Sequence, residues 1–448
     1  MDGTIWAETA LLPGGWAGGV SVTLAEGRIA SVETGVAPRG MRVPCLLPAP
    51  VNLHSHTFQR AMAGLAERRG PGADSFWTWR AVMYRFLDRL TPEDVEAIAG
   101  QAMVEMAEAG FAAVCEFHYL HHGPGGVPYA DRAEMAARIV AAAETAGLGL
   151  TLLPVVYMQG GCEGRPLEGG QKRFRCDPDM LSAILEASPG LSRDGVLGIA
   201  PHSLRAVPPA ALAEAMAMRP GAPLHIHAAE QPAEVDDVRA ALGARPVEWL
   251  LDRGVDARWC LIHTTHMTAA EVAGLAASGA VAGLCPITEA NLGDGIFEGA
   301  AYRAAGGRIG VGTDSNILIS LAEELRTMDY AQRLRDRARS VLAPPGGSVG
   351  RDLFDRVAAG GAQAAGRAAG AIAPGLWADL MALDTTHPSL AGASGDGLLD
   401  GWIFACNQTV VTDLWSAGRH VVHGGRHVAR AAVAARYRGV MARLRDAL

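Results

Sequence analysis

Short apolar segments recur through the middle of the chain, separated by alanine-rich stretches with the periodicity of helices. Apolar runs bounded by turn residues are typical of buried strands, and a period near 3.6 indicates amphipathic helices. A regular succession of strand and helix units predicts an α/β fold, and a (β/α)8 TIM-type barrel accommodates all of them. The strands are expected at 46–53, 111–118, 148–157, 195–201, 223–228, 258–263, 280–286 and 307–312, and the helices between them include 92–109, 132–146, 208–218, 233–242 and 268–277.

The two ends of the chain show a different pattern. Residues 1–48 alternate short apolar pieces with glycine-containing turns, as hairpins do, and turn-rich β pattern returns after Gly370. We expect residues 1–48 and 371–448 to form one small β-sandwich domain, and residues 49–370 to form the barrel. The later strands are expected at 378–383, 402–405 and 420–423, a last helix at 429–448, and surface loops at 123–126, 160–170 and 345–350.

The composition excludes several classes of protein. The net charge of −8 and the absence of a basic stripe argue against nucleic acid or an anionic membrane as the main partner. No apolar run reaches the length of a membrane span, and the first residues do not have the pattern of a signal peptide. Seven cysteines without C-x-x-C spacing fit reduced thiols. We therefore expect a cytoplasmic protein.

Histidines and carboxylates cluster where the predicted strands end. Active sites of (β/α)8 barrels lie at the C-terminal ends of the strands. His54 and His56 follow the first strand, and residues two apart in an extended segment share a face, so both imidazoles can bind one metal ion. The other polar residues at strand ends are Glu116, His118, Tyr119, His202, His227, Glu230, His263, His266 and Asp314.

In this order and spacing, the motifs resemble the amidohydrolase superfamily: His54-Ser55-His56, Leu224 to Glu230, Leu261 to His266 and Gly312 to Asn316. Further segments resemble one family within it, the formimidoylglutamate deiminases: Asn52 to Ala61, Ser75 to Arg80, Glu116 to His122 and Cys285 to Gly295. The resemblance extends over essentially the whole chain. It implies a hydrolase that acts on a C–N bond of a linear amidine.

The resemblance implies a mononuclear metal site, usually zinc. Three imidazoles and one carboxylate would leave one position for water, whose pKa zinc lowers to about 7. Two-metal members of the superfamily bridge their ions with a modified lysine from a central strand, whereas Lys172, the only lysine here, lies in a glycine-rich loop. One divalent ion is therefore favoured, with the ligands His54, His56, His227 and Asp314.

The same resemblance implies the catalytic roles. Glu230, three residues beyond His227, would take a proton from the attacking water and deliver it to the leaving nitrogen. His263 would polarise the substituent of the attacked carbon or assist proton transfer beside Asp314. Asp314 would also hold or accept a proton of the water. For His266, a role at the site and a purely structural role both stay open.

The implied substrate is N-formimino-L-glutamate, which is hydrolysed to N-formyl-L-glutamate and ammonia in histidine degradation. It carries one amidine-like cation and two carboxylates, so its pocket should offer anionic groups near the metal and arginines farther out. The family also suggests a homodimer. By resemblance, the substrate-binding residues are Gln59, Arg80, Tyr119, His202 and Arg205.

Other interpretations stay open at this point. A deaminase of a purine, pyrimidine or related heterocycle would use the same metal chemistry, with aromatic stacking in place of paired arginines. Hydrolysis to glutamate and formamide is another possible reaction, and a non-catalytic scaffold is a third. Among the remaining histidines, His225 is expected to support the ligands, and His118, His121 and His122 to be packed or at a rim. His387, His420, His423 and His427 are expected at the surface.

Overall fold

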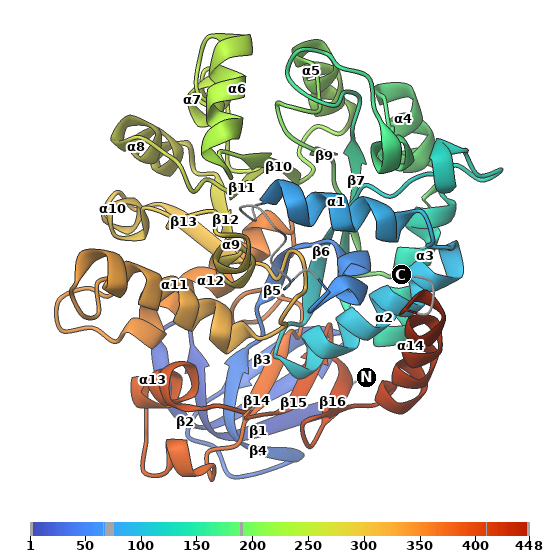
Figure 1. The fold of residues 1–448 in the computed structure, drawn as a ribbon. Coiled ribbons are helices and arrows are strands. Elements are labelled where there is room, and N and C mark those ends of the chain that lie inside the picture. The colour runs from blue at the N-terminus through green and yellow to red at the C-terminus, as the bar shows by residue number, and fades with distance from the viewer. Residues whose placement is uncertain (1–2, 66, 68–75, 189–190, 409, 446–448) are drawn as a thin grey trace.

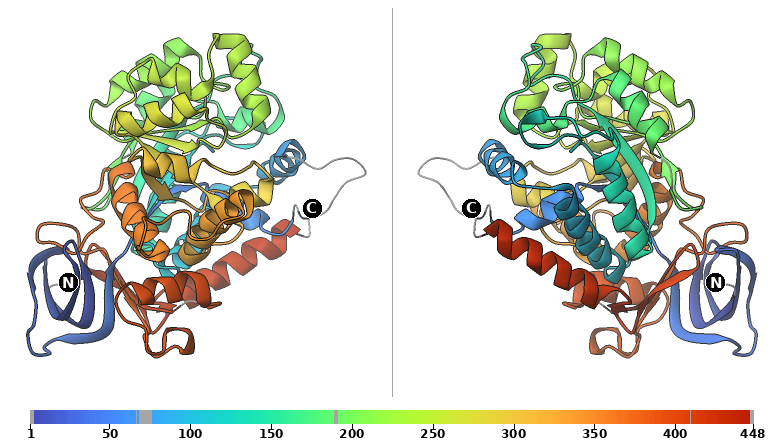
Figure 2. Two further views of the ribbon diagram at one scale, coloured as in Figure 1. Left: turned by 90° about the vertical axis from the view of Figure 1, so that its left-hand side faces the viewer. Right: turned by 90° about the vertical axis from the view of Figure 1, so that its right-hand side faces the viewer.

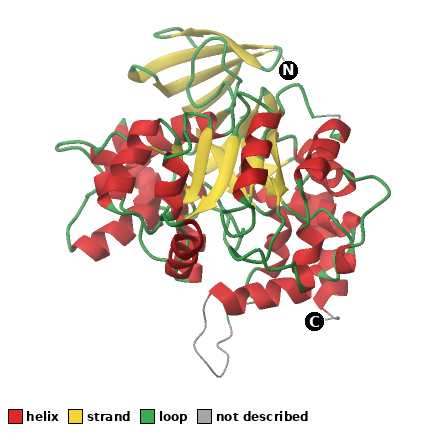
Figure 3. Ribbon diagram, turned by 90° about the horizontal axis from the view of Figure 1, so that it is seen from above, coloured by secondary structure: helices red, strands yellow, loops and turns green. Residues whose placement is uncertain are grey.

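Parallel strands surrounded by helices form the centre of the protein (Figures 1 and 3). The computed structural model describes residues 3–65, 67, 76–188, 191–408 and 410–445, so Ser75 of the motif above lies outside the described residues. The strands are β5 (Val51–Ser55), β6 (Ala113–His118), β7 (Gly149–Val156), β8 (Val196–Leu197), β9 (Ala200–Pro201), β10 (Leu224–Ala228), β11 (Trp259–His263), β12 (Val281–Leu284) and β13 (Arg308–Val311).

These strands pair in two parallel sheets, β5-β6-β7-β8 with β9 beside β7, and β10-β11-β12-β13. Parallel bridges join the sheets at both seams, Ile199 to Leu224 and Ser55 to Asp314. The ring is therefore closed, and the prediction of a (β/α)8 barrel is confirmed.

Helices cover the outside of the ring, and the ends of the five helices predicted there agree with the structure within two residues. Thr91 and Thr268 begin two of them with capping boxes, in which each threonine side chain accepts a hydrogen bond from the backbone three residues on. The helices are α1 (Phe76–Leu87), α2 (Pro92–Glu108), α3 (Glu134–Ala146), α4 (Pro178–Ala187), α5 (Pro209–Met218), α6 (Pro232–Leu242), α7 (Pro246–Leu251), α8 (Ala269–Ser278), α9 (Pro286–Leu292), α10 (Gly299–Ala304), α11 (Leu321–Asp336) and α12 (Val349–Ala364).

The two ends of the chain share one sheet with the order β17-β16-β15-β14-β4-β1-β2-β3. It encloses its own apolar core, which includes Ile5, Val22, Leu380 and Trp415, so the expected small β-domain is present. Figure 2 shows it beside the barrel, with the N-terminal strands outermost. The strands are β1 (Gly3–Leu12), β2 (Gly15–Ala25), β3 (Arg28–Glu33), β4 (Met41–Pro48), β14 (Leu380–Leu383), β15 (Val411–Ser416), β16 (Arg419–His423) and β17 (Arg426–His427).

Three predicted strands differ from the structure, and one of them, 195–201, is divided into β8 and β9. The run 46–53 is divided between β4 and β5 at Ala49 and Pro50, where the chain passes from the sheet of the β-domain to the barrel and Pro50 has no N–H to donate. The predicted strand 402–405 is wrong, because it lies in α13 (Asp396–Ala405). Leu398, Leu399, Trp402 and Ile403 are buried at helical spacing, and a window of four apolar residues cannot distinguish a helix from a strand.

The last helix, α14 (Arg430–Arg445), crosses to the barrel and packs against α2 (Figure 2). The division of the chain at residues 48/49 and 370/371 therefore stays a prediction. No helix in the described ranges is both long and apolar enough to cross a membrane. The seven cysteines are free thiols, as expected. Short 3-10 turns complete the fold: η1 (Thr57–Met62), η2 (Pro124–Gly126), η3 (Gly169–Phe174) and η4 (Pro388–Leu390).

Candidate active site

The seam between β5 and β13 brings the His54–His56 segment against Asp314. The backbone N–H of His56 donates to the Asp314 carbonyl and that of Asp314 to the His54 carbonyl, each at 2.9 Å. Gly312 is needed for this approach, because a Cβ there would lie 2.6 Å from the backbone N and O of His54. The Asn52 side chain adds a hydrogen bond of 2.7 Å to Thr313 Oγ1. Residues far apart in sequence are thus fixed by backbone pairing.

The four predicted metal ligands meet at the C-terminal mouth of the barrel. His54 Nε2 lies 3.1 Å from His227 Nε2 and 3.5 Å from Asp314 Oδ1, and His56 Nε2 lies 3.3 Å from the same carboxylate oxygen. All four residues are buried, with exposures of 5% or less. Three nitrogens and an oxygen therefore converge from three different strands.

The tautomers of two of these histidines suit a metal. Nδ1 of His56 lies 3.0 Å from the Phe117 carbonyl, and Nδ1 of His227 lies 3.0 Å from the His202 carbonyl. Because a carbonyl only accepts, each Nδ1 carries the proton and each Nε2 presents a lone pair. Burial lowers the pKa of His54 to about 3 and also lowers the pKa values of His56 and His227, so the rings are neutral at pH 7. The donor set fits a divalent cation.

The carboxylate of Glu230 lies beside this cluster and faces His263. Glu230 Oε1 is 3.7 Å from His263 Nε2, and Glu230 Oε2 is 4.0 Å from Arg205 Nη2. Burial and the nearby carboxylates of Glu234 and Asp314 raise the pKa of Glu230 to about 7, against the opposing effect of His263 and Arg205. A carboxylate with such a pKa can both accept and return a proton near neutral pH.

Glu289 holds the other side of the His263 ring. Its Oε1 lies 3.2 Å from His263 Nδ1 and accepts a hydrogen bond of 2.9 Å from the backbone N–H of Cys285. Burial alone would lower the pKa of His263, but Glu230, Glu289 and Asp314 outweigh it and raise the pKa to about 10. His263 is therefore a proton donor between two carboxylates. The sequence motif contained Glu289, but no pattern assigned it this position.

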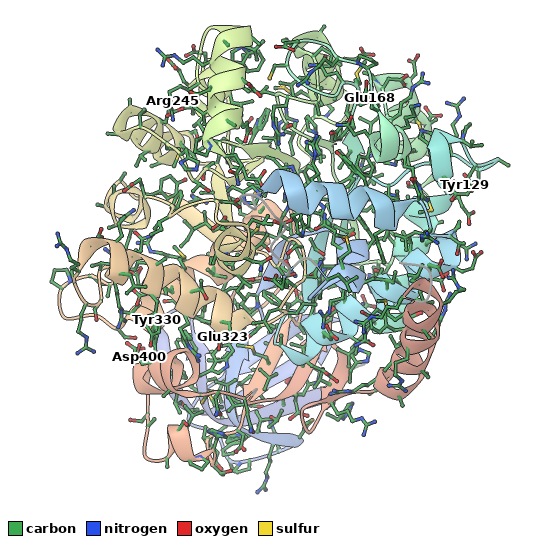
Figure 4. The ribbon with its side chains drawn as sticks, in the orientation of Figure 1. Tyr129, Glu168, Arg245, Glu323, Tyr330 and Asp400 are labelled. Atoms are coloured by element: carbon green, nitrogen blue, oxygen red, sulfur yellow. The ribbon has the colours of Figure 1, made fainter. Side chains whose placement is uncertain are left out.

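Asp294 is a further buried carboxyl group near Glu230 and His263; like Glu289, it lies in the motif Cys285 to Gly295, but no pattern assigned it this position. Ligand atoms of these three side chains lie within 4.8 Å of one another. Gln231 donates to Asp294 Oδ1, and His266 Nε2 donates to the Asp294 backbone carbonyl at 2.8 Å. Arg245, labelled at α7 in Figure 4, donates to the His266 carbonyl and so braces the loop from outside. His266 thus serves to hold the segment that carries Asp294.

One pocket of about 570 Å³, its mouth included, lies above the cluster. All five predicted substrate-binding residues line it, together with Glu230, His263 and Asp314. Gln59 Nε2 donates to the Tyr119 hydroxyl at 2.6 Å, and His202 Nδ1 lies 3.0 Å from Ser203 Oγ. Lining residues that the sequence did not single out are Trp79, Met83, Tyr84, Tyr157, Phe174, Thr288, Leu292 and Ser315.

Strained backbone is concentrated at this site. Non-glycine residues with positive φ include Ala229 (55°), His263 (70°), Thr264 (48°), Asp314 (44°) and Asn316 (55°). Such conformations cost free energy and persist where the surroundings impose them, commonly in active sites. Hydrogen bonds supply that constraint here, among them the bond of 3.1 Å from Asn316 Nδ2 to Ser55 Oγ.

The remaining histidines lie outside the cluster. His225 donates to the Ala364 carbonyl at 2.8 Å, deeper in the barrel than His227. His121 and His122 bond to the carbonyls of Val155 and Arg175, as expected for packed residues. The prediction for His427 is wrong. This residue was expected at the surface but is 2% exposed, because β17 places it against the end of α3, where Nε2 bonds to Ala146 O at 2.9 Å.

Comparisons with known proteins agree with this geometry. The model of the amidohydrolase family matches residues 45–421, and the model of the N-terminal domain of formimidoylglutamate deiminase HutF matches residues 3–41. The chain belongs to the amidohydrolase family. Formimidoylglutamate deiminase from Pseudomonas aeruginosa is 48% identical over 99% of both chains. A 5-methylthioadenosine/S-adenosylhomocysteine deaminase from Natronomonas pharaonis is 29% identical over 77% of this chain and 74% of its own length.

Solved structures of this amidohydrolase's relatives show the same fold. An amidohydrolase from Brucella melitensis superposes with a TM-score of 0.95 at 50% identity, covering 98% of this chain and 99% of its own. An adenosine deaminase from Xanthomonas campestris with bound zinc has a TM-score of 0.81 at 22% identity, covering 99% and 98%, which establishes the shared fold alone.

Proposed function

We propose that this amidohydrolase is a formimidoylglutamate deiminase, which hydrolyses N-formimino-L-glutamate to N-formyl-L-glutamate and ammonia in histidine degradation. The observation that carries the proposal is the pocket. It combines a carboxylate-rich inner end with Arg80 and Arg205, and so complements a substrate with one cationic end and two carboxylates. The full-length similarity to the Pseudomonas aeruginosa enzyme supports the same substrate.

We assign the metal site to His54, His56, His227 and Asp314, holding one divalent ion, Zn²⁺ in our proposal. The inward lone pairs of neutral imidazoles and the single carboxylate support this set. When bound, the ion supplies Lewis acidity and lowers the pKa of water to about 7. Lys172 is exposed in η3, outside the pocket lining, which supports a single ion.

The protein's own groups account for the proton movements. Glu230 takes a proton as water attacks the formimino carbon and a C–O bond forms, and Asp314 accepts or holds a hydrogen bond from the same water. Glu230 then passes the proton to the imino nitrogen. The second proton of the water passes to Asp314 as the C=O bond of the formyl group forms, the C–N bond breaks, and ammonia leaves with the electron pair. His263, protonated between Glu230 and Glu289, polarises the substituent of the attacked carbon or assists this transfer.

The other side chains orient the substrate. Arg80 and Arg205 bind its carboxylates, and Gln59, Tyr119 and His202 complete the contacts. All five lie in one pocket although they come from η1, α1 and the ends of β6 and β9. Holding both substrate ends fixed converts binding energy into orientation, an effect that can lower the barrier by several kcal/mol.

A heterocycle deaminase is the second candidate, and one observation favours it. Trp79, Tyr84, Tyr119, Tyr157 and Phe174 give the pocket an aromatic lining on which a flat ring can stack. The two arginines in the same lining favour the dicarboxylate. A non-catalytic scaffold is disfavoured, because the ligands and Glu230 converge in one site.

The deciding experiment incubates zinc-loaded protein with N-formimino-L-glutamate, follows ammonia with a coupled assay, and identifies the organic product by mass. We expect ammonia and N-formylglutamate. If the products are formamide and glutamate, the assignment of the substrate stands, but the proposed deimination is wrong. Absence of turnover in metal-loaded protein, with turnover of a heterocyclic amine, would establish the second candidate instead.

We also propose that the enzyme acts in the cytoplasm as a homodimer, with no nucleic acid or membrane partner. The acidic composition supports the absence of a nucleic acid partner. Light scattering during gel filtration tests the dimer, for which we expect twice the chain mass of 46.7 kDa.

A further inference from the structure

A second group of metal-binding side chains lies in the β-domain. Asp413 on β15 and His420 and His423 on β16 each offer a ligand atom, and these atoms lie within 4.8 Å of one another. None of the three residues lines the active-site pocket. The proposed deimination makes no use of them.

A β-bulge brings the two histidines to the same face of the sheet. Residues three apart in a regular strand point to opposite faces. Here Trp415 pairs with His420 and Leu414 pairs with Val422, so β16 has one extra residue between the two pairs. The extra residue shifts the alternation of side chains between the two faces of the sheet. His423 therefore lies on the same face as His420 and Asp413. A bulge that re-aims a side chain is a way to assemble a site.

Neighbouring groups hold these side chains in place. The His420 ring stacks on the Trp415 ring, with the ring centroids 4.3 Å apart and an angle of 16° between the ring planes. The centroid of the His423 ring lies 3.5 Å from the centroid of the His420 ring. His420 Nε2 is 2.9 Å from Asp413 Oδ1. His423 Nε2 donates to the His420 carbonyl at 3.1 Å, which leaves a lone pair on Nδ1. Little side-chain freedom remains to be lost when an ion binds.

The cluster is also open to solvent. The side chains of Asp413 and His420 are 14% and 9% exposed, and His423 is an exposed residue. An ion can therefore enter directly, and water can complete its coordination. Two imidazoles and one carboxylate suit borderline divalent ions and discriminate against Mg²⁺ and Ca²⁺, which prefer oxygen ligands alone.

We propose that Asp413, His420 and His423 form a surface site for an exchangeable divalent transition-metal ion such as Zn²⁺, separate from the active-site cluster. The bound ion joins β15 to β16 across the bulge.

The test counts ions on chelator-treated full-length protein. Zn²⁺ is titrated in competition with a chromophoric chelator, and the bound ions are counted by elemental analysis after equilibrium dialysis. We expect wild type to bind one more ion than His423→Ala, whose affinity for that ion should fall at least tenfold. His387→Ala, a change at a half-buried histidine outside the cluster, is the matched control and should bind like wild type.

A second readout reports the location of the ion. Cu²⁺ quenches indole fluorescence at short range, and Trp415 lies against the His420 ring. Part of the tryptophan emission of wild type should therefore be lost on adding Cu²⁺, and this part should be missing in His423→Ala and in Trp415→Phe. Turnover of N-formimino-L-glutamate should be unchanged in His423→Ala. Equal ion counts and equal quenching in wild type and His423→Ala would overturn the proposal.

Discussion

Asp194 and Asp294 are each only 3% exposed, yet their surroundings are opposite. Asp194 lies between two arginines, with Arg367 Nη2 at 2.9 Å and Arg419 Nη2 at 2.7 Å. Burial would raise its pKa, but the hydrogen bonds and charges of Arg419 and Arg367 hold the pKa well below its usual range. Asp294 lies near Glu230, and burial together with that carboxylate raises its pKa to about 9.

The difference reflects what each region does. Arg367 also pairs with Asp379 at 2.6 Å, so the Asp194 cluster joins the barrel to the β-domain with its charges balanced. Near Asp294, carboxyl groups outnumber the cations, and Asp294 Oδ2 has no hydrogen-bond partner among the described residues. Ionising all of these carboxyl groups together would be unfavourable, which is why the pKa values of Glu230 and Asp294 are raised, whereas a metal ion and a cationic substrate would favour the ionised forms. The balanced charges around Asp194 stabilise the fold, whereas the unbalanced carboxyl groups around Asp294 lie at the end of the pocket where we propose that the reaction occurs.

The largest effect is expected at Glu230. Glu230→Gln keeps the side-chain shape but cannot accept a proton, so kcat should fall about 10³-fold. Metal content and thermal stability should stay close to wild type, because Glu230 is not among the proposed ligands. His227→Ala should lose both metal and turnover. Steady-state ammonia release and elemental analysis measure both properties, and a metal-loaded Glu230→Gln enzyme with full activity would remove the assigned role.

In the balanced cluster, Asp194→Asn should lower the free energy of unfolding by about 3 kcal/mol at pH 7, because it leaves the two arginines with Asp379 as their only counter-charge in the cluster. Since the folded-state pKa of Asp194 is depressed, its stabilisation is present above the unfolded-state value of about 3.9 and is lost as pH falls below it. Urea unfolding from pH 7 to pH 3 should therefore show the difference from wild type shrinking only below about pH 4. KM should not change. A large KM change with unaltered stability would contradict the structural role.

A smaller effect is expected at Glu289, which touches the reacting groups only through His263. Glu289→Gln should lower kcat about 10- to 100-fold, the usual cost of removing a group that orients a functional histidine. KM should change much less, because Glu289 does not line the pocket. Glu289→Ala should be worse than Glu289→Gln, since glutamine can still bond to the ring. Equal kcat values for the two variants would show that the hydrogen bond to His263 does not contribute to catalysis.

The smallest effect on stability is expected for Asp294→Asn. The raised pKa means that folded Asp294 stays protonated while the unfolded chain ionises, so wild type loses stability as pH rises from about 4 towards 9. Asparagine does not ionise. In chelator-treated protein, the variant should lie within about 1 kcal/mol of wild type at pH 5 and gain relative to it at pH 8. Urea unfolding at both pH values measures the difference in free energy of unfolding. If the variant is less stable relative to wild type at pH 8 than at pH 5, Asp294 is not protonated in the folded protein.

Local patterns in the sequence were enough to predict the barrel and the position of its polar residues at the strand ends. Buried strands and amphipathic helices leave a periodic signature, and the resemblance of the His54–His56 segment, His227 and Asp314 to one superfamily supplied the candidate site. Where the signature was short, it failed. The run 402–405 is part of a helix, and the buried position of His427 depends on α3, far away in the chain.

The relations between residues far apart in the chain depend on how the chain packs in three dimensions. The position of Glu289 and Asp294 around His263, the pairing of Asp194 with Arg367, and the bulge that aligns His420 with His423 arise when distant segments close on one another. Such contacts have no repeat along the chain, because their spacing depends on loop lengths and strand register. Local patterns along the chain thus account for the layers and for the chemical groups available, whereas three-dimensional packing determines which charges are balanced and which are left for chemistry.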